Sequence, residues 1–332
     1  MENGSPGKPK VLLSIVTWNH EKTILETLDS IRNQTYRHFE LVILDNKSAD
    51  GTIKLLREYQ AKLKFELIEH TENIGFSGGH NHIISNYSFD YIILVNPDII
   101  LNPDYVEQTL KAFQIHPDIG AVCGLLVQSS ADNPIIDSAG MELTRSRRFI
   151  LKDHGKQLNT IQLESGYVAG LDGALPAFKK EAVLASLVNG EFFNSMFFSH
   201  KEDWDISWRL ILFGWKVYFN KESIAVHPRF FKPNQLKLRK SIDDTIKYHG
   251  FKNQFLLLLI NEDRSNFMKD ILSIVPRIII TTVFCLLFER GSLKAYSYLS
   301  TNKKEIKARR KNIHERRKVG PQEFRRHFIS AG

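Results

Sequence analysis

Cysteine is scarce in this chain of 332 residues, which contains only two. Cys123 and Cys285 lie far apart in apolar stretches, so the sequence predicts no disulfide framework and favours a reducing, cytosolic compartment. A secretory signal is also missing, because residues 1–10 are rich in Gly, Pro and Lys and contain no apolar core. We interpret residues 1–10 as a flexible leader.

We also expect no clean membrane-spanning segment. Residues 271–288 are strongly apolar, but they contain Pro276 and Arg277. A spanning helix needs about 20 apolar residues, and a central arginine costs roughly 2.5 to 3.5 kcal/mol on insertion scales. Two interpretations stay open. The segment is either an interfacial or re-entrant helix whose basic neighbours bind lipid headgroups, or it is part of a helical hairpin packed on the core.

The net charge of +8 is unevenly distributed. Residues 303–326 contain eleven Lys or Arg and three Glu, so this tail alone carries an excess equal to that of the whole chain. Such a tail either binds an anionic membrane surface or is a solvated, disordered segment. It has few aromatic residues on which bases could stack, so we expect no nucleic-acid partner.

Short apolar runs alternate with helical patterns in the first part of the chain. The runs at residues 11–16, 39–44, 65–68 and 91–95 predict buried strands. This alternation predicts an α/β fold with a mostly parallel central sheet flanked by helices, followed by a helical C-terminal appendage. In such sheets ligands bind beyond the carboxyl ends of the strands. Polar and glycine residues gather at those ends, namely Thr17, Trp18, Asn19, Asp45, Asn73, Gly75 and Asp98.

Neither of the familiar phosphate-binding loops is present. No Gly-x-Gly-x-x-Gly follows the first predicted strand, and no Gly-Lys-Ser/Thr follows the glycines of residues 75–79, which predict a loop of bare backbone. Any phosphate charge must therefore be neutralised in another way. A divalent cation, Mn²⁺ or Mg²⁺, held by Asp98 is the device that we expect, although Asp98 could also be a turn residue that caps a helix.

Three carboxylates occupy four positions at Glu202, Asp203 and Asp205. Their mutual repulsion raises at least one proton affinity and suits a general base, while an acidic helix start is the alternative. Trp204 lies among them, and indole faces commonly pack against sugar rings. His227 follows a predicted strand, and it either completes a metal shell with Asp98 or is structural.

Taken together, these stretches resemble a known family. The matching segments are Ser14-Ile-Val-Thr-Trp-Asn19, residues 44–52, residues 73–81, Asn96-Pro-Asp98, Asp172-Gly-Ala174, Glu202-Asp-Trp-Asp205 and His227. They occur in the order seen in inverting family-two glycosyltransferases of GT-A fold, and the likeness is closest to the rhamnosyltransferase-like branch. It covers residues 11–230. It implies a Rossmann-like nucleotide-binding half at 11–128 and an acceptor half at 129–246. The apolar and basic composition of residues 247–332 predicts a helical, membrane-associating region there.

The resemblance also implies residue roles. Asp203 would be the catalytic base with Glu202 beside it, and Asp98 with His227 would bind the metal. The nucleotide-sugar site would comprise Thr17, Asn19, Asp45, Asn73, Gly75, Phe76, Gly79, Asn81 and Asn96. The acceptor would meet Asp172, Gly173, Ala174 and Trp204.

Two departures from the family pattern stand out. Asn96 occupies the first position of the Asp-x-Asp motif, and residues 189–196 lack the usual Gly-Gly-Phe-Asp before the acidic motif. The hypothesis is transfer of a sugar, with L-rhamnose from dTDP-L-rhamnose favoured, to a lipid-linked or polysaccharide acceptor in bacterial cell-surface glycan synthesis. A polyprenyl-diphosphate saccharide at the inner face of the membrane would be such an acceptor. The alternative is a catalytically degenerate subunit that binds nucleotide sugar or is recruited to the membrane.

Overall fold

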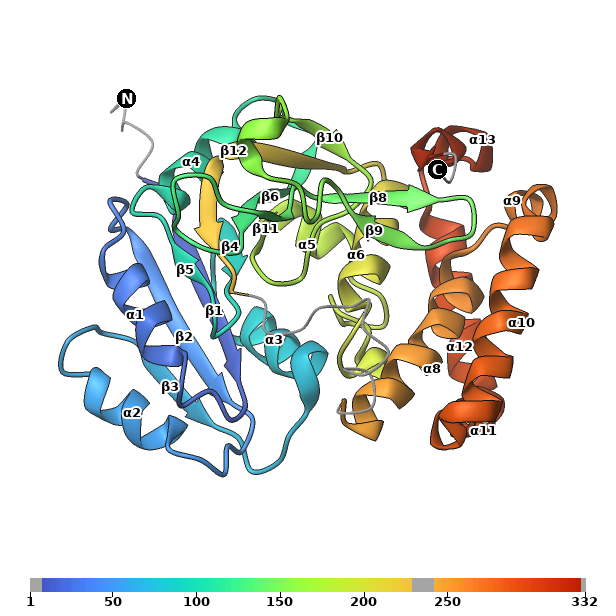
Figure 1. The fold of residues 1–332 in the computed structure, drawn as a ribbon, viewed down its shortest axis with the longest axis horizontal. Coiled ribbons are helices and arrows are strands. Elements are labelled where there is room, and N and C mark those ends of the chain that lie inside the picture. The colour runs from blue at the N-terminus through green and yellow to red at the C-terminus, as the bar shows by residue number, and fades with distance from the viewer. Residues whose placement is uncertain (1–7, 229–241, 330–332) are drawn as a thin grey trace, which may run out of the picture.

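A parallel sheet forms the N-terminal half of the computed structural model, which describes residues 8–228 and 242–329. The flexible-leader prediction falls mostly on residues 1–7, outside this part. Strands β1 (Val11–Thr17), β2 (Phe39–Asp45), β3 (Glu66–Glu69) and β4 (Tyr91–Leu94) pair in the order β3-β2-β1-β4, all parallel (Figure 1). The sequence predicted these four strands within about two residues.

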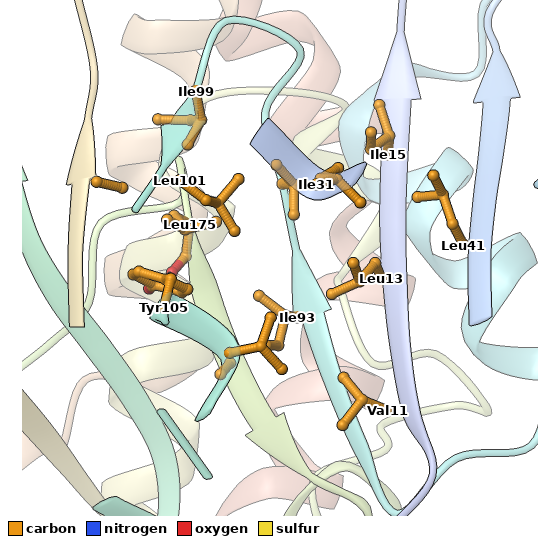
Figure 2. Close-up of a cluster of buried hydrophobic side chains, with 14 of the residues drawn as sticks. Val11, Leu13, Ile15, Ile31, Leu41, Ile93, Ile99, Leu101, Tyr105 and Leu175 are labelled. Carbon is orange, nitrogen blue, oxygen red and sulfur yellow. The ribbon is translucent and has the colours of Figure 1, made fainter. Parts of the chain in front are cut away.

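Apolar side chains on both faces of this sheet are buried, as expected for parallel strands. Leu13, Ile15 and Ile93 belong to one core, which Ile31 of helix α1 (Ile24–Arg32) helps to close (Figure 2). Their sequence neighbours, such as Leu12, point into a second core on the opposite face. Helices α2 (Thr52–Tyr59) and α4 (Tyr105–Phe113) complete the first layer.

The glycine-rich stretch differs from the prediction, because it is helical. Helix α3 (Gly75–Asn86) begins at the first glycine, although glycine is a poor helix former. Packing decides the outcome: a Cβ added at Gly79 would lie 2.7 Å from Val16 Cγ1 of β1, so the bare backbone lets the helix approach the sheet.

The second half of the sheet is mixed. Strand β11 (Pro176–Lys179) lies antiparallel between β4 and β6 (Ile119–Val127). Strand β12 (Lys216–Val226) runs parallel to β6, with a register shift between Asn220 and Ile224. The sequence predicted two short strands in place of β12, because the polar stretch within this bulge breaks the apolar pattern. Strands β5 (Ile100–Leu101), β7 (Ile136–Ser138) and β10 (Gly166–Val168) pair along this half.

The polar segment after β6 contains a hairpin. Strands β8 (Met141–Thr144) and β9 (Phe149–Leu151) pair antiparallel, and β13 (Phe328–Ile329), near the C-terminus, adds to β8. Helices α5 (Lys180–Ala185) and α6 (Glu202–Leu212) follow in the chain, with the single turn η2 (Ser195–Phe197) between them.

The C-terminal region is helical, as predicted. It comprises α8 (Asp244–Asn261), α9 (Arg264–Lys269), α10 (Ile271–Phe288), η3 (Arg290–Leu293), α11 (Lys294–Thr301), α12 (Lys303–Arg316) and α13 (Pro321–Phe324). The basic tail is not a loose segment, because α12 packs on α8 and buries Ile306 and Ile313. The domain boundaries given above stay predictions.

A buried ion cluster joins this region to the β8–β9 hairpin. Arg147 is 1 % exposed and pairs with Glu262 and, at 2.8 Å, with Asp270. Arg325 pairs with Asp270 from the other side at 2.7 Å. Moving the hairpin away from the C-terminal helices would leave these buried charges uncompensated, which is costly. The cluster therefore holds the hairpin and the C-terminal region in one arrangement.

Candidate functional site

Thr17 and Asp45 end neighbouring strands in the same register, at the carboxyl edge of the sheet. Each of the two residues is only 1 % exposed. The Asp45 carboxylate accepts hydrogen bonds from the Ser48 backbone N–H at 2.7 Å and from the Ser48 hydroxyl at 2.5 Å. Asn19 joins the same turn, because its side-chain oxygen accepts from Ala49 N–H at 2.8 Å. Thr17, Asn19 and Asp45 therefore lie together at the edge of the sheet where β1 and β2 end.

The start of α3 is tied to this edge. Asn46 donates its side-chain amide to the Gly75 carbonyl at 3.1 Å, and Asn73 accepts from Gly75 N–H at 2.9 Å. Phe76 is partly buried against His80 and Phe193. Asn81 has both side-chain groups bonded to the Phe193 backbone, so its amide anchors the segment before α6.

Asp98 faces His227 just beyond β4 and β12. Asp98 Oδ2 lies 3.7 Å from His227 Nε2, and His227 Nδ1 lies 2.8 Å from the fully buried Asp137. Burial alone would lower the pKa of His227, but its hydrogen bonds with Asp137 and Asp98 raise it to about 9. Burial alone would raise the pKa of Asp98, but the hydrogen bond and charge of His227 lower it below its usual value.

This pair has the chemistry of a divalent-cation site. A carboxylate oxygen and an imidazole nitrogen face each other, and a buried carboxylate fixes the second imidazole nitrogen, as is common behind metal-binding histidines. The described residues contain no group of three or more such ligands. Mn²⁺ or Mg²⁺ would therefore take its remaining ligands from substrate phosphates and water.

Asp203 lies in the first turn of α6 against the loop of residues 172–174. Its carboxylate accepts from Gly173 N–H at 3.2 Å and from Trp204 N–H at 2.9 Å, and the residue as a whole is partly buried. Burial and the charge of Asp172 raise the pKa of Asp203. Burial and the charge of Asp203 likewise raise the pKa of Glu202, whose Oε2 has no hydrogen-bond partner among the described residues. The pair can therefore hold or accept a proton near neutral pH.

The other members of the acidic motif point elsewhere. Asp205 is fully buried, pairs with Arg209 at 2.9 Å and accepts from the Asn261 amide at 2.7 Å, so it is a structural carboxylate. Trp204 is partly buried with its ring 5.5 Å from that of Phe149, and it packs against the cluster shared with the C-terminal helices.

The remaining segments are joined by the backbone. Asn96 N–H donates to the Ala174 carbonyl at 2.9 Å, which links the strand-end motif to the loop that holds Asp203. The negative charge of Asp172 acts on both Asp203 and His227. The candidate base Asp203 and the candidate metal residue His227 thus share one neighbour, and His227 in turn faces Asp98, which lies more than a hundred residues before Asp203 in the chain.

Sequence reasoning missed two residues of the site. Asp137 orients His227 from inside a polar segment that carries no recognisable motif, so no signal in the sequence indicated it. His20 lies close enough to Asp98 to lower its pKa, and burial lowers the pKa of His20 itself. Its position directly after the strand-end residues 17–19 was a usable signal.

Comparisons with known proteins show which family and which folds the chain resembles. Residues 13–172 match the family model described as glycosyl transferase family 2. The poly-β-1,6-N-acetyl-D-glucosamine synthase of Staphylococcus aureus (strain COL) is 25 % identical over 205 residues, which are 62 % of this chain and 46 % of that protein. The synthase of Staphylococcus epidermidis is 22 % identical over 64 % of this chain and 48 % of its own length. The chain thus spans about half the length of these curated relatives.

Solved structures show the same fold. The mannosyltransferase PcManGT from Pyrobaculum calidifontis, in complex with GDP-Man and Mn²⁺, has a TM-score of 0.54 at 16 % identity, over 89 % of this chain and 76 % of that one. GalNAc-T7 with UDP, GalNAc and Mn²⁺ has a TM-score of 0.57 at 15 % identity, over 76 % of this chain and 48 % of that one. The chain therefore has the GT-A fold of these structures, and its residues 13–172 are similar to the model of glycosyl transferase family 2.

Proposed function

We propose that the chain is an inverting glycosyltransferase that moves a sugar from a nucleoside diphosphate to an acceptor hydroxyl. The setting of Asp203 carries this proposal. Its carboxylate is held by a backbone N–H of the 172–174 loop and has a raised pKa, and the residue as a whole is only partly buried. A carboxylate with these properties suits proton abstraction from a hydroxyl near neutral pH.

In the proposed reaction the acceptor oxygen attacks the anomeric carbon while the bond from that carbon to the diphosphate oxygen breaks. Asp203 takes the proton of the attacking hydroxyl, so inversion needs one base and no covalent enzyme intermediate. Gly173 N–H, 3.2 Å from Asp203 Oδ2, holds the carboxylate in place. Glu202 is buried in the same turn, where burial and the charge of Asp203 raise its pKa.

The edge beyond β1 and β2 would take the nucleotide, with Asp45 and Thr17 at its floor. Asp98 and His227 would hold a divalent cation, which when bound supplies positive charge to the departing diphosphate. Asp137 keeps His227 Nε2 turned towards Asp98. The metal dependence and these individual roles are part of the proposal.

Replacing Asp203 with asparagine tests the mechanism. The variant keeps the side-chain shape and loses the base, so sugar transfer should fall by about 10²- to 10⁴-fold while nucleotide binding is retained. Glu107→Gln is the matched control, because Glu107 also lies in the first turn of a helix but pairs with Lys111 on the surface. Full transfer activity in Asp203→Asn would refute the mechanism.

The donor that we favour is dTDP-L-rhamnose, on the strength of the motif resemblance described above. The relatives bear other names, since the structures of PcManGT and GalNAc-T7 contain GDP-Man and UDP with GalNAc. Thermal stabilisation by dTDP-rhamnose, UDP-GlcNAc and GDP-mannose, each with and without Mn²⁺, discriminates between these donors. Stabilisation by another nucleotide sugar but not by dTDP-rhamnose would overturn the rhamnose assignment and leave sugar transfer intact.

A second function is favoured by one residue. Asn96 stands where a second carboxylate would strengthen the grip on a cation, which is compatible with a degenerate subunit that binds nucleotide sugar without transfer. Release of nucleoside diphosphate in the presence of acceptor separates the two functions. A pure binding subunit would release none.

We also propose that the protein works at the cytoplasmic face of the membrane on a lipid-linked acceptor, such as a polyprenyl-diphosphate saccharide used in cell-surface glycan synthesis. Helix α10 supports this location. By length and composition alone it could cross a membrane, because its mean hydropathy is 2.3 and only 11 % of its residues are buried in the protein. It lies at the end of the molecule farthest from α1 and α2 (Figure 1).

The two faces of α10 favour a helix that lies in the membrane interface rather than one that spans it. One face packs on the protein, with Ile274 and Cys285 buried and Arg277 donating to the Ser146 carbonyl at 2.8 Å. Arg277 therefore points towards the protein. The insertion cost that the sequence assigned to an arginine in the hydrocarbon region does not apply to this orientation. The outward face exposes Leu272, Ile279, Ile280, Val283, Leu286, Leu287 and Phe288, with Leu272 at 88 % and Ile280 at 67 %.

Cations flank this apolar face. Lys269 precedes α10, and Arg290 and Lys294 follow it, which suits anionic headgroups around a helix immersed in the interface. Flotation with anionic vesicles tests the proposal with Ile280→Glu/Leu287→Glu, which should lose binding. The control Leu184→Glu changes a similarly exposed leucine on α5, 56 % exposed, and should bind normally. Equal binding by both variants would refute the location, and a concentration-dependent dimer lost in Ile280→Glu/Leu287→Glu would assign the face to a second copy instead.

A further inference from the structure

The segment that leads into the acidic motif has an unusual backbone. Phe198, His200 and Lys201 all have positive φ, at 64°, 68° and 67°, although none is a glycine. Lys201 is the residue directly before α6, so the strained segment ends where Glu202 and Asp203 begin. Non-glycine residues remain in this conformation only where their surroundings hold them there.

Helix α8 supplies the groups that hold the segment. The side-chain amide of Asn253, which is fully buried, lies 2.9 Å from the Phe197 carbonyl, 2.8 Å from that of Ser199 and 2.6 Å from that of His200. Lys252, one residue earlier, donates to the Met196 carbonyl from a buried ammonium group. Two adjacent side chains thus bind four carbonyls of residues 196–200.

The opposite side of the segment rests on the start of α3. The Phe198 carbonyl accepts from Ser77 N–H at 3.1 Å, and the Phe198 ring stacks on His249 of α8 at a centroid distance of 4.8 Å. Gly75 leaves room for this contact, because a Cβ there would lie 2.5 Å from the Phe198 oxygen. The segment is therefore clamped between the helix that begins the proposed donor site and α8.

We infer that Asn253 is a positioning residue for sugar transfer, which fixes the strained segment 197–200 and through it the place of Asp203 relative to the start of α3. The inference rests on the proposed function of Asp203. An amide NH₂ has two hydrogens for three carbonyls, and of the common residues of this size only asparagine presents such a donor without charge. Aspartate or leucine at this position would leave the buried carbonyls without a donor.

Hydrogen exchange and steady-state kinetics on the full chain test the inference. In Asn253→Ala, amides of residues 197–204 should exchange faster, and kcat should fall by roughly 10- to 100-fold, as expected for a small misplacement of a reacting group. KM for the nucleotide sugar should change less than twofold. Asn266→Ala is the matched control, because Asn266 is also a buried asparagine of the C-terminal helices and donates to the Pro321 carbonyl at 2.9 Å.

Lys252→Met provides a second reading if Asn253→Ala does not fold, because it keeps the aliphatic stem and removes the donor to Met196. It should show the same faster exchange and the same fall in kcat. Loosened exchange with an unchanged kcat in either folded variant would overturn the positioning role while leaving the proposed function intact. A wild-type protein that transfers no sugar would refute the proposed function, and unchanged exchange at 197–204 in both variants would refute the clamp by itself.

Discussion

Alanine at Gly75 should destabilise the protein more than alanine at Gly155, although both glycines have positive φ, at 75° and 83°. The left-handed conformation costs a residue with a Cβ roughly 1–2 kcal/mol. At Gly155 that is the whole cost, because no heavy atom lies within 4 Å of the added Cβ. At Gly75 the Cβ would lie 2.5 Å from the Phe198 carbonyl oxygen and 2.7 Å from its ring.

The contact at Gly75 adds a second cost. Overpacking in a well-packed region typically costs about 1–3 kcal/mol, because the neighbours must move. The neighbour here is the Phe198 backbone. Ser77 N–H donates to the Phe198 carbonyl, and the Asn253 amide donates to the carbonyls of the adjoining residues Phe197 and Ser199, so this backbone is held in place. We therefore expect a total loss of roughly 2–5 kcal/mol for Gly75→Ala against roughly 1–2 kcal/mol for Gly155→Ala.

Urea unfolding followed by circular dichroism measures both losses, with stability obtained by linear extrapolation. Gly155→Ala is the control, since it reports the backbone term alone. Equal losses in the two variants would show that the close approach of Phe198 to α3 does not constrain the protein. That result would refute the reasoning that position 75 requires glycine because of the nearby Phe198 backbone and not because of a bound ligand.

Three further outcomes follow from the site. The transfer rate should rise with pH along an acid limb well above the value of about 3.9 for a free aspartate, because Asp203 acts as a base only when ionised and its pKa is raised. Asp172→Asn removes one cause of that rise and should move the limb to lower pH, which a pH–rate profile would detect. Asp205→Ala should cost about 3–5 kcal/mol by leaving Arg209 buried and unpaired, and a loss within 0.5 kcal/mol in thermal unfolding would contradict its structural role. Chelation with EDTA should abolish transfer and added Mn²⁺ should restore it, and His227→Ala should raise the Mn²⁺ concentration needed; full activity in EDTA would remove the cation from the proposal.

Local pattern predicted the elements whose residues are buried on a regular period. The predicted strand at 91–95 and the apolar run at 271–288 coincide with β4 and α10. The antiparallel direction of β11 was beyond the sequence, since this short run contains nothing that distinguishes antiparallel from parallel pairing. The start of α3 at Gly75 was missed for a related reason, because its helix depends on contacts with Val16 and Phe198 rather than on helix propensity.

The candidate site divides in the same way. Strand ends predicted where Thr17, Asp45 and Asp98 would gather, because parallel strands end at one edge of a sheet. The supporting residues could not be predicted, because Asp137 comes from a segment without periodicity and Asn253 comes from the C-terminal region, for which the sequence predicted membrane association. Such partners are chosen by three-dimensional proximity, which a single sequence does not encode.

The ion cluster around Arg147 bears on how this protein can be dissected. A chain cut after residue 246 would lose Glu262 and Asp270, the two carboxylates that neutralise Arg147, together with the Asn253 amide that supports the approach to Asp203. Any inactivity of such a fragment would follow from these lost contacts, so it would say nothing about a role of lipids. Single substitutions on the outer side of α10 leave every one of these contacts in place.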